Sequence, residues 1–215
     1  MFLRSVKLKN MPKLGKFSNK KVVFGFIVFL ILVIGGLFFW WQSSKEIKGS
    51  PDDYVIKETE EGIFVENKKA GLIVKAPEGW EARRVEEEGG AIDFDSLDLE
   101  TNKEKGRIVL PLKKGCKIQA AVEYGEFNLT DIEIETRYSL ALMGMKSVNF
   151  EEIYINNYPA LKSIFGLEED GSGVGMAVSV AGDNKVYSFS VMWGFDDKEK
   201  CIQEFENFLE TISIQ

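Results

Sequence analysis

The first strong feature in the hydrophobic pattern is an uninterrupted apolar run. Val22–Trp41 contains twenty residues without a charge, and at about 1.5 Å per residue a helix of this length crosses the roughly 30 Å hydrocarbon core of a bilayer. A buried helix of a soluble domain would carry polar residues on part of its circumference. The run therefore predicts a single transmembrane helix that ends with two interfacial tryptophans.

Beyond this helix the pattern becomes polar and then alternates. Gln42–Asp53 is polar and contains turn-forming residues, which predicts a flexible linker. From Tyr54 apolar and polar residues alternate mostly with period two, as in strands that bury one face. We therefore expect one folded domain over residues 54–215. Its predicted strands are Gly62–Glu66, Gly71–Ala76, Glu81–Val85, Ala91–Phe94, Lys117–Tyr124, Phe150–Ile155, Ala160–Leu167, Gly173–Val180 and Lys185–Trp193.

Two stretches replace the alternation with helical spacing. The first opens at Thr130, with Glu133 three residues later in the arrangement of a capping box. It continues through Tyr138, Leu142 and Met145. These apolar residues are expected to form one face that lies on the sheet.

The second helix opens at Asp196 or Asp197. Its apolar stripe consists of Cys201, Phe205, Phe208, Leu209 and Ile212. Between two of the predicted strands, Glu168–Gly173 has the composition of a hairpin turn. The order of strands, helix, strands and helix predicts an α+β fold, in which a mainly antiparallel sheet is flanked by helices.

Charge is distributed unevenly around the apolar run. The formal net charge of the chain is −7, but residues 1–21 contain seven basic residues and no acidic one, so residues 42–215 carry −14. Basic flanks stay on the cytoplasmic side of a membrane, which predicts a cytoplasmic segment at 1–21 and an extracytoplasmic domain. A cleaved signal peptide is excluded by length, because its apolar region spans only about 7–15 residues. The basic residues are Arg4, Lys7, Lys9, Lys13, Lys16, Lys20 and Lys21.

Composition narrows the chemistry of this acidic domain. The chain has no histidine, which removes the most common general base and metal ligand near neutral pH. Two cysteines are too few for a thiolate zinc cluster or a dense disulfide framework. An acidic surface also repels nucleic acid. We therefore predict no catalytic residues, no cofactor and no metal site, and no nucleic-acid partner.

Two acidic motifs resemble parts of known functional sites. Asp93, Asp95 and Asp98 resemble the start of a calcium loop, but Leu97 occupies the third ligand position and no glycine follows at the sixth. An exposed acidic strand end is the better interpretation. Glu86–Glu88 precedes two glycines and is interpreted as a solvated turn; the alternative, one half of a glycosidase carboxylate pair, has no second carboxylate at a defined distance.

One predicted strand has a strongly aromatic face. The residues on this face are Tyr187, Phe189, Val191 and Trp193. Core packing is the expected role of such a stripe, and an exposed groove for a ligand is the alternative.

Cys116 and Cys201 are both expected to point inward. Counting by two from Cys116 reaches apolar strand residues, and Cys201 shares the helical stripe with Phe205 and Phe208. If the second helix covers that strand face, the two residues can form a disulfide; otherwise they are two buried thiols. The sequence leaves both alternatives open.

Several segments resemble one known family. Ala70–Trp80, which reads AGLIVKAPEGW, resembles the strand and Pro-x-Gly-Trp turn that open domains of the PsbP family, named after the extrinsic subunit of photosystem II. Ile155–Leu161 resembles a short middle strand of that family, and Val186–Ser190 with the second predicted helix resembles its last strand and helix. The resemblance covers Gly62–Ile214 and implies a three-layer α/β/α domain. It supplies no manganese or calcium ligand set.

The Pro-x-Gly-Trp turn also has a physical explanation of its own. Pro77 sets a turn and cannot donate to a strand ladder, Gly79 permits a positive φ, and Trp80 then enters the core. The motif therefore indicates a fold rather than an activity.

Together these features predict a membrane-anchored, extracytoplasmic, non-catalytic module that binds or supports an envelope protein or a small ligand. A small-ligand carrier or sensor is the first alternative, and a hydrolase that uses only carboxylates is the second. The sequence leaves the ligand, the partner and the oligomeric state open.

Overall fold

The computed structural model describes residues 47–85, 90–101, 112–167, 173–194 and 196–215. The predicted transmembrane helix Val22–Trp41, the basic segment before it and the Glu86–Glu88 motif lie outside the described residues, as does most of the turn predicted at Glu168–Gly173. No helix within the described ranges has the length and apolar character that a membrane crossing requires.

Two antiparallel sheets form within the described residues. The larger has eight strands, in the order β5-β6-β7-β11-β10-β9-β8, with β1 paired to β7; the smaller has the order β12-β4-β3-β2. The strands of the larger sheet are β1 (Ile47–Lys48), β5 (Glu81–Val85), β6 (Ala91–Asp95), β7 (Cys116–Tyr124), β8 (Met145–Ile155), β9 (Tyr158–Leu167), β10 (Gly173–Gly182) and β11 (Lys185–Trp193). Those of the smaller sheet are β2 (Tyr54–Thr59), β3 (Gly62–Asn67), β4 (Leu72–Lys75) and β12 (Ser213–Ile214).

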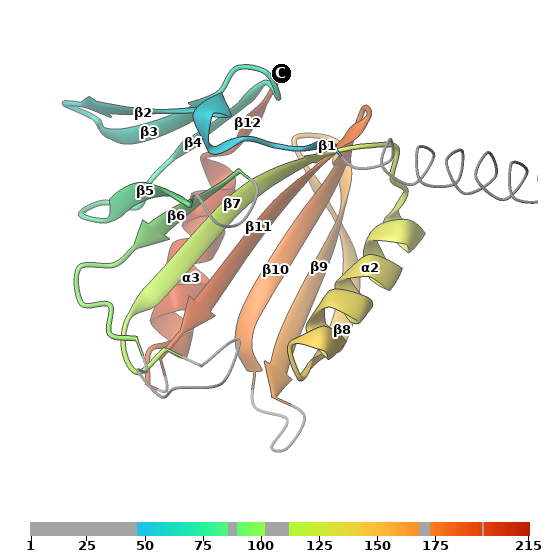
Figure 1. The fold of residues 1–215 in the computed structure, drawn as a ribbon. Helices are drawn as coiled ribbons and strands as arrows, with labels where there is room; N and C mark the ends of the chain where they lie inside the picture. Colours follow the sequence, from blue (N-terminus) through green and yellow to red (C-terminus); the bar gives the residue numbers. More distant parts are fainter. Residues whose placement is uncertain (1–46, 86–89, 102–111, 168–172, 195) are drawn as a thin grey trace, which may run out of the picture. The chain divides into compact units, whose positions relative to one another are not determined.

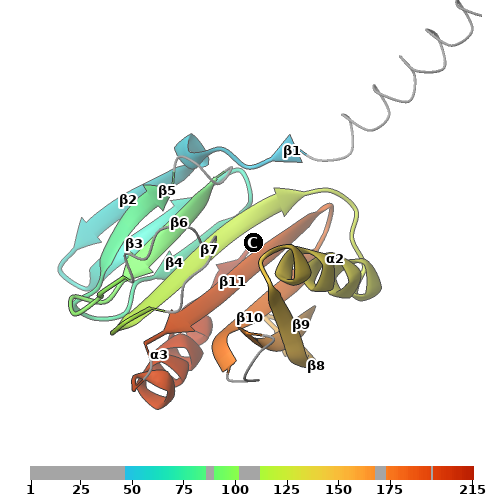
Figure 2. The ribbon, with the colours of Figure 1, turned by 60° about the horizontal axis from the view of Figure 1, so that its bottom comes forward.

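Helices α2 (Leu129–Leu142) and α3 (Lys198–Glu210) lie on opposite faces of the larger sheet (Figures 1 and 2). The main core lies between this sheet, α3 and the smaller sheet, and it includes Phe189 of β11, Phe205 and Phe208 of α3, and Leu72 of β4. On the other face, α2 packs on β8 and β9 through two smaller apolar clusters. The mainly antiparallel α+β fold is thus as predicted, but the small second sheet was not expected.

The folded part begins earlier than the predicted domain boundary at Tyr54. Within the predicted linker Gln42–Asp53, Ile47 and Lys48 pair with Tyr124 and Glu123 of β7. A 3₁₀ turn, η1 (Pro51–Asp53), follows. Its cap is Ser50, whose hydroxyl accepts a hydrogen bond from the backbone of Asp52. Composition alone suggested flexibility, but these residues are tied to the sheet because β7 extends beyond β6 and offers free backbone groups there.

The turn after β4 has the geometry that its sequence predicted. The backbone N–H of Trp80 donates to the carbonyl of Pro77 at 3.1 Å, and Gly79 adopts φ +77°. Trp80 is buried in the main core. A residue with a side chain would be strained at position 79, since positive φ is a conformation that mainly glycine adopts without cost.

Candidate functional site

The three acidic residues that resembled a calcium loop do not converge on one point. Asp93 is buried on β6, and its carboxylate accepts from Arg83 Nη2 at 2.6 Å and from Gln119 Nε2 at 3.0 Å. Lys117 Nζ lies 2.7 Å from the same carboxylate, and Asp95 pairs with Arg83 Nε at 2.8 Å. Among the described residues no group of three potential ligands is placed to hold a metal ion. The cluster joins β5, β6 and β7 through ion pairs.

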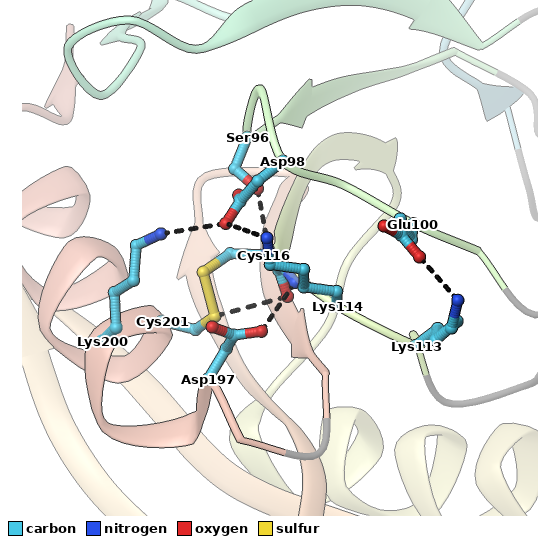
Figure 3. A network of polar contacts seen from close by, with 10 residues as sticks. Ser96, Asp98, Glu100, Lys113, Lys114, Cys116, Asp197, Lys200 and Cys201 are labelled. Carbon is cyan, nitrogen blue, oxygen red and sulfur yellow. Dashed lines mark hydrogen bonds and ion pairs between the residues drawn. A yellow bond between two sulfur atoms is a disulfide. The ribbon is translucent and has the colours of Figure 1, made fainter.

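Asp98 belongs to a different network, at the corner where α3 begins (Figure 3). The Ser96 hydroxyl accepts from the backbone N–H of Cys116 at 2.9 Å and donates to Asp98 Oδ1 at 2.8 Å. Lys200 Nζ and Lys114 Nζ lie 3.5 and 3.8 Å from Asp98 Oδ2. Asp98 therefore connects the loop after β6 to both the start of β7 and the first turn of α3.

A disulfide joins Cys116 and Cys201 in this corner, with 5.5 Å between their Cα atoms. Both residues are fully buried. The backbone N–H of Gly115 donates to Asp197 Oδ2 at 2.7 Å, so a hydrogen bond lies beside the covalent link. α3 is thus fixed to the first residue of β7 at its N-terminal end, and the network has the character of a structural clamp.

Electrostatics in this corner favour ionised carboxylates. The hydrogen bond from the Ser96 hydroxyl holds the pKa of Asp98 below its usual value, and Lys200 and Lys114 act in the same direction. Lys113 lowers the pKa of Glu100 through a hydrogen bond. A general acid working near neutral pH needs a raised pKa, so neither group is suited to that role.

The aromatic face of β11 is part of the core, as expected. Its four residues are all at most 4% exposed: Tyr187, Phe189, Val191 and Trp193. The hydroxyl of Tyr187 donates to the carbonyl of Ala70 at 2.6 Å and so connects β11 to the turn before β4. The alternative of an exposed aromatic groove on this strand is therefore wrong.

α2 begins at a different residue from the one predicted. Asn128, not Thr130, is the N-cap: its side chain accepts from the backbone N–H of Asp131 at 3.0 Å, and the Asp131 carboxylate accepts from the backbone N–H of Asn128 at 3.2 Å. This is a capping box shifted by two residues. Gly144, with φ +70°, follows the last turn, and Met145 starts β8 instead of continuing the helix.

The apolar face of α2 also differs from the predicted one. Ile132 and Leu140 are the residues buried against the sheet, at 4% and 5% exposure. Tyr138 and Leu142, expected on the sheet, point away from it. The helix carries apolar residues on two opposite sides, and only one side can pack on β8 and β9.

The outward side of α2 presents a continuous apolar stripe. Ile134, Tyr138 and Leu142 follow each other at intervals of four residues, and their exposed fractions are 63%, 65% and 64%. On a helix this spacing places side chains in one row. We name these three residues the α2 stripe. The sequence contained the signal for it, namely the second series of apolar residues on this helix, but not the information on which series faces the core.

One long polar side chain lies along the edge of α2 next to β8. Arg137 forms an ion pair with Glu133 at 2.7 Å and lies over the ring of Phe150 at 4.3 Å from its centroid. Tyr154 of β8 is 73% exposed and projects from the same face of the sheet as Phe150. Four of the six large apolar residues that are exposed in the described part of the chain are thus on α2 or on β8.

No known protein family matches the sequence, and no characterised protein matches it at the level of sequence. Solved structures that are similar to this chain include three proteins from different bacteria. Cyanobacterial PsbP (CyanoP) from Synechocystis sp. PCC 6803 is 13% identical, with a TM-score of 0.48 over 70% of this chain and 90% of that one. LpqN from Mycobacterium tuberculosis, involved in cell envelope biogenesis, is 11% identical, with a TM-score of 0.47 over 76% and 94%. PA94 from Pseudomonas aeruginosa, of unknown function, is 10% identical, with a TM-score of 0.43 over 75% and 97%.

PsbP, the family that the sequence motifs resemble, is thus among these structures. A function cannot be transferred at this distance, because one fold hosts many activities. The function of this chain has to be argued from its own surface.

Proposed function

We propose that this chain is a single-pass membrane protein whose folded domain lies outside the cytoplasm and binds another envelope protein without catalysing a reaction. The anchor is Val22–Trp41, and the N-terminal segment is cytoplasmic. This topology is supported by the uncharged run itself and by the contrast between seven basic residues before it and a net charge of −14 after it.

The α2 stripe is the observation that carries the proposed binding role. α3 buries its apolar residues in the core, whereas α2 leaves three large apolar side chains in solvent. The large exposed apolar residues of the described part are Val55, Leu97, Ile134, Tyr138, Leu142 and Tyr154. Half of them are therefore aligned on one helix face. Scattered apolar residues are normal on a surface, but an aligned group marks an interaction site.

The binding free energy that the α2 stripe can contribute is consistent with a partner anchored in the same membrane. Full burial of one such side chain is worth about 1.5–3 kcal/mol. Because roughly two-thirds of each side chain is exposed, covering the α2 stripe contributes about 3–6 kcal/mol. Association of two free proteins costs about 4–15 kcal/mol in lost motion. Attachment to the same membrane reduces that cost by raising the effective concentration, so a stripe too small for a soluble complex is sufficient between anchored partners.

A non-catalytic role is supported by the surroundings of the carboxylates. With no histidine in the chain, the side chain that most often acts as general acid or base is missing, and carboxylates are the next candidates. Asp93 is neutralised by Arg83 and Lys117, and the pKa of Asp98 is lowered rather than raised. The lowered pKa makes Asp98 unsuited to the role of a proton donor near neutral pH.

Site-specific photo-crosslinking in intact cells tests this proposal. A photoreactive phenylalanine analogue replaces Tyr138 in the full chain, and the same analogue replaces Glu60, which is also exposed to solvent, in the turn between β2 and β3. We expect a defined crosslinked protein from position 138, identified by mass spectrometry, and none from position 60. The crosslink should disappear when Ile134→Gln and Leu142→Gln are added.

If position 138 gives no crosslink beyond that of position 60, the α2 stripe is not a binding surface. If the product persists after the two glutamine substitutions, the contact does not depend on the apolar row and the proposal is also wrong.

A further inference from the structure

The chain segment that contains the α2 stripe is rich in acidic residues. Residues 123–155, which include α2 and β8, contain seven acidic and two basic residues and so carry a net charge of −5. This is more than a third of the net charge of residues 42–215 in less than a fifth of their length. The acidic residues are Glu123, Glu126, Asp131, Glu133, Glu135, Glu151 and Glu152.

Acidic residues outnumber basic ones both in this segment and on α2. On α2 itself, Arg137 is the single basic residue among three acidic ones, and it is engaged by Glu133. Glu135 lies one residue beyond Ile134 and three before Tyr138, and it is exposed. Glu152 is exposed on β8 and projects from the face of the sheet that α2 covers. The apolar row is therefore bordered by carboxylates.

We infer that the partner of the α2 stripe is a basic amphipathic segment of a protein, with an apolar row flanked by lysine or arginine residues. This inference rests on the proposed function and specifies the class of partner. From Ile134 to Leu142 the stripe extends about 12 Å along the helix, which matches two to three turns of a partner helix. Two helices that pack side by side use apolar residues at intervals of three and four residues.

Charge disfavours the other occupants of this surface. In a second copy of this chain, the same acidic border would face itself, and like charges across an interface are costly. An anionic lipid surface is repelled for the same reason. A basic segment gains from the carboxylates in two ways, because they increase its association rate and orient it over the stripe.

A binding assay with a defined peptide tests the inference. The full chain is placed in nanodiscs of zwitterionic phosphatidylcholine, and empty nanodiscs provide the baseline. The probe is a fluorescent 14-residue helical peptide of leucine and lysine, and its counterpart has glutamate in place of lysine. Fluorescence anisotropy should show binding of the lysine peptide and at least about tenfold weaker binding of the glutamate peptide, a difference of 1.4 kcal/mol.

Two pairs of substitutions separate local charge from general acidity. Glu135→Gln with Glu152→Gln should weaken binding of the lysine peptide several-fold and reduce its dependence on salt. Glu58→Gln with Glu60→Gln removes the same charge from exposed positions on β2 and its turn, and should leave the Kd within twofold. Ile134→Gln with Leu142→Gln should weaken binding at least as much as the local charge pair.

The inference is wrong if both peptides bind equally or if the two charge pairs have the same effect. It is also wrong if the crosslink from position 138 contains a second copy of this chain, lipid or an acidic protein. A crosslink to an acidic protein would leave the proposed function standing while the partner class would not. A crosslink to lipid or to a second copy of this chain would contradict the proposed function as well. Absence of any crosslink from position 138 would remove both.

Discussion

Removal of the Cys116–Cys201 disulfide should lower the stability of the domain substantially. The bond closes a loop between residues 85 positions apart. In the chain-entropy model, closure of a loop of this length is worth about 4–5 kcal/mol, because it removes conformations from the unfolded chain. For a domain of this size 1 kcal/mol corresponds to about 2–4 °C. The variant Cys116→Ala with Cys201→Ala should therefore melt about 8–20 °C below the unaltered protein.

Tryptophan fluorescence provides a suitable assay. Trp80 and Trp193 are buried in the domain core and report its unfolding. The full chain is melted in detergent with and without reductant, and the double alanine variant is melted under the same two conditions. Reductant should lower the melting temperature of the unaltered protein towards that of the variant and leave the variant unchanged. Because both cysteines are fully buried, this reduction should require unfolding.

One result would refute the reasoning, namely a melting temperature of the double alanine variant within about 2 °C of that of the unaltered protein, both without reductant. It would show either that the disulfide is not formed or that closing its loop does not reduce the entropy of the unfolded chain. Alkylation in denaturant of protein isolated from its own membrane separates these cases: no added alkyl group means a bridge, and two mean free thiols.

Three further predictions concern stability. Ile134→Gln and Leu142→Gln should each change the free energy of unfolding by no more than about 0.5 kcal/mol, whereas Ile132→Gln on the buried face of α2 should cost at least about 2 kcal/mol in a urea titration. Burial raises the pKa of Tyr187 to about 12. The neutral phenol therefore stabilises the fold fully below pH 10, and this stabilisation is lost as the pH rises from 10 to 12. Tyr187→Phe should reduce the loss of stability at alkaline pH, and an unchanged midpoint of alkaline unfolding would contradict this prediction. Hydrogen bonding by Ser96 lowers the pKa of Asp98 from its usual 3.8. The ionised Asp98 therefore stabilises the fold above pH 3.8, and this stabilisation is lost on further acidification. The Asp98→Asn variant should lose less stability between pH 5 and pH 2 than the unaltered protein, and equal losses in the two proteins would refute this prediction.

Strands β3 to β11 and helix α3 could be predicted because the pattern of each allows one arrangement, whereas β1, β2 and β12 were not predicted. The alternation in β11 allows only one face to be aromatic, and the apolar stripe of α3 begins at Cys201, one turn after the N-cap Asp197. Burial of Phe205 and Phe208 follows from that stripe. In such segments local sequence and tertiary packing favour the same arrangement.

The orientation of α2 could not be predicted in this way. Its sequence contains two apolar series, one with Ile132 and Leu140 and one with Ile134, Tyr138 and Leu142. The choice between them depends on the shape of the sheet face formed by residues distant in sequence. The proposed binding surface lies on this helix. The second apolar side of α2 makes its sequence pattern ambiguous, and the same side provides the exposed α2 stripe.

The ion pairs of Asp93 and the second sheet were beyond prediction for a related reason. Arg83 and Lys117 reach Asp93 because β5 and β7 pair with the two edges of β6. β3 and β4 pair with β2 and β12 rather than with the larger sheet. Alternating patterns specify the faces of a strand but not its neighbours.

The central claim, that a partner covers the α2 stripe, is tested most directly by thiol accessibility at Leu142. Leu142→Cys and, as control, Glu60→Cys are labelled with a membrane-impermeant maleimide in intact cells and in the purified full chain. Both positions are exposed in the structure, so both should react readily once purified. If a partner occupies about 90% of the molecules, labelling of Leu142→Cys in cells should be about tenfold slower than in the purified chain, while Glu60→Cys should be unaffected. Equal labelling of Leu142→Cys in both states would contradict the proposal that this surface binds a partner.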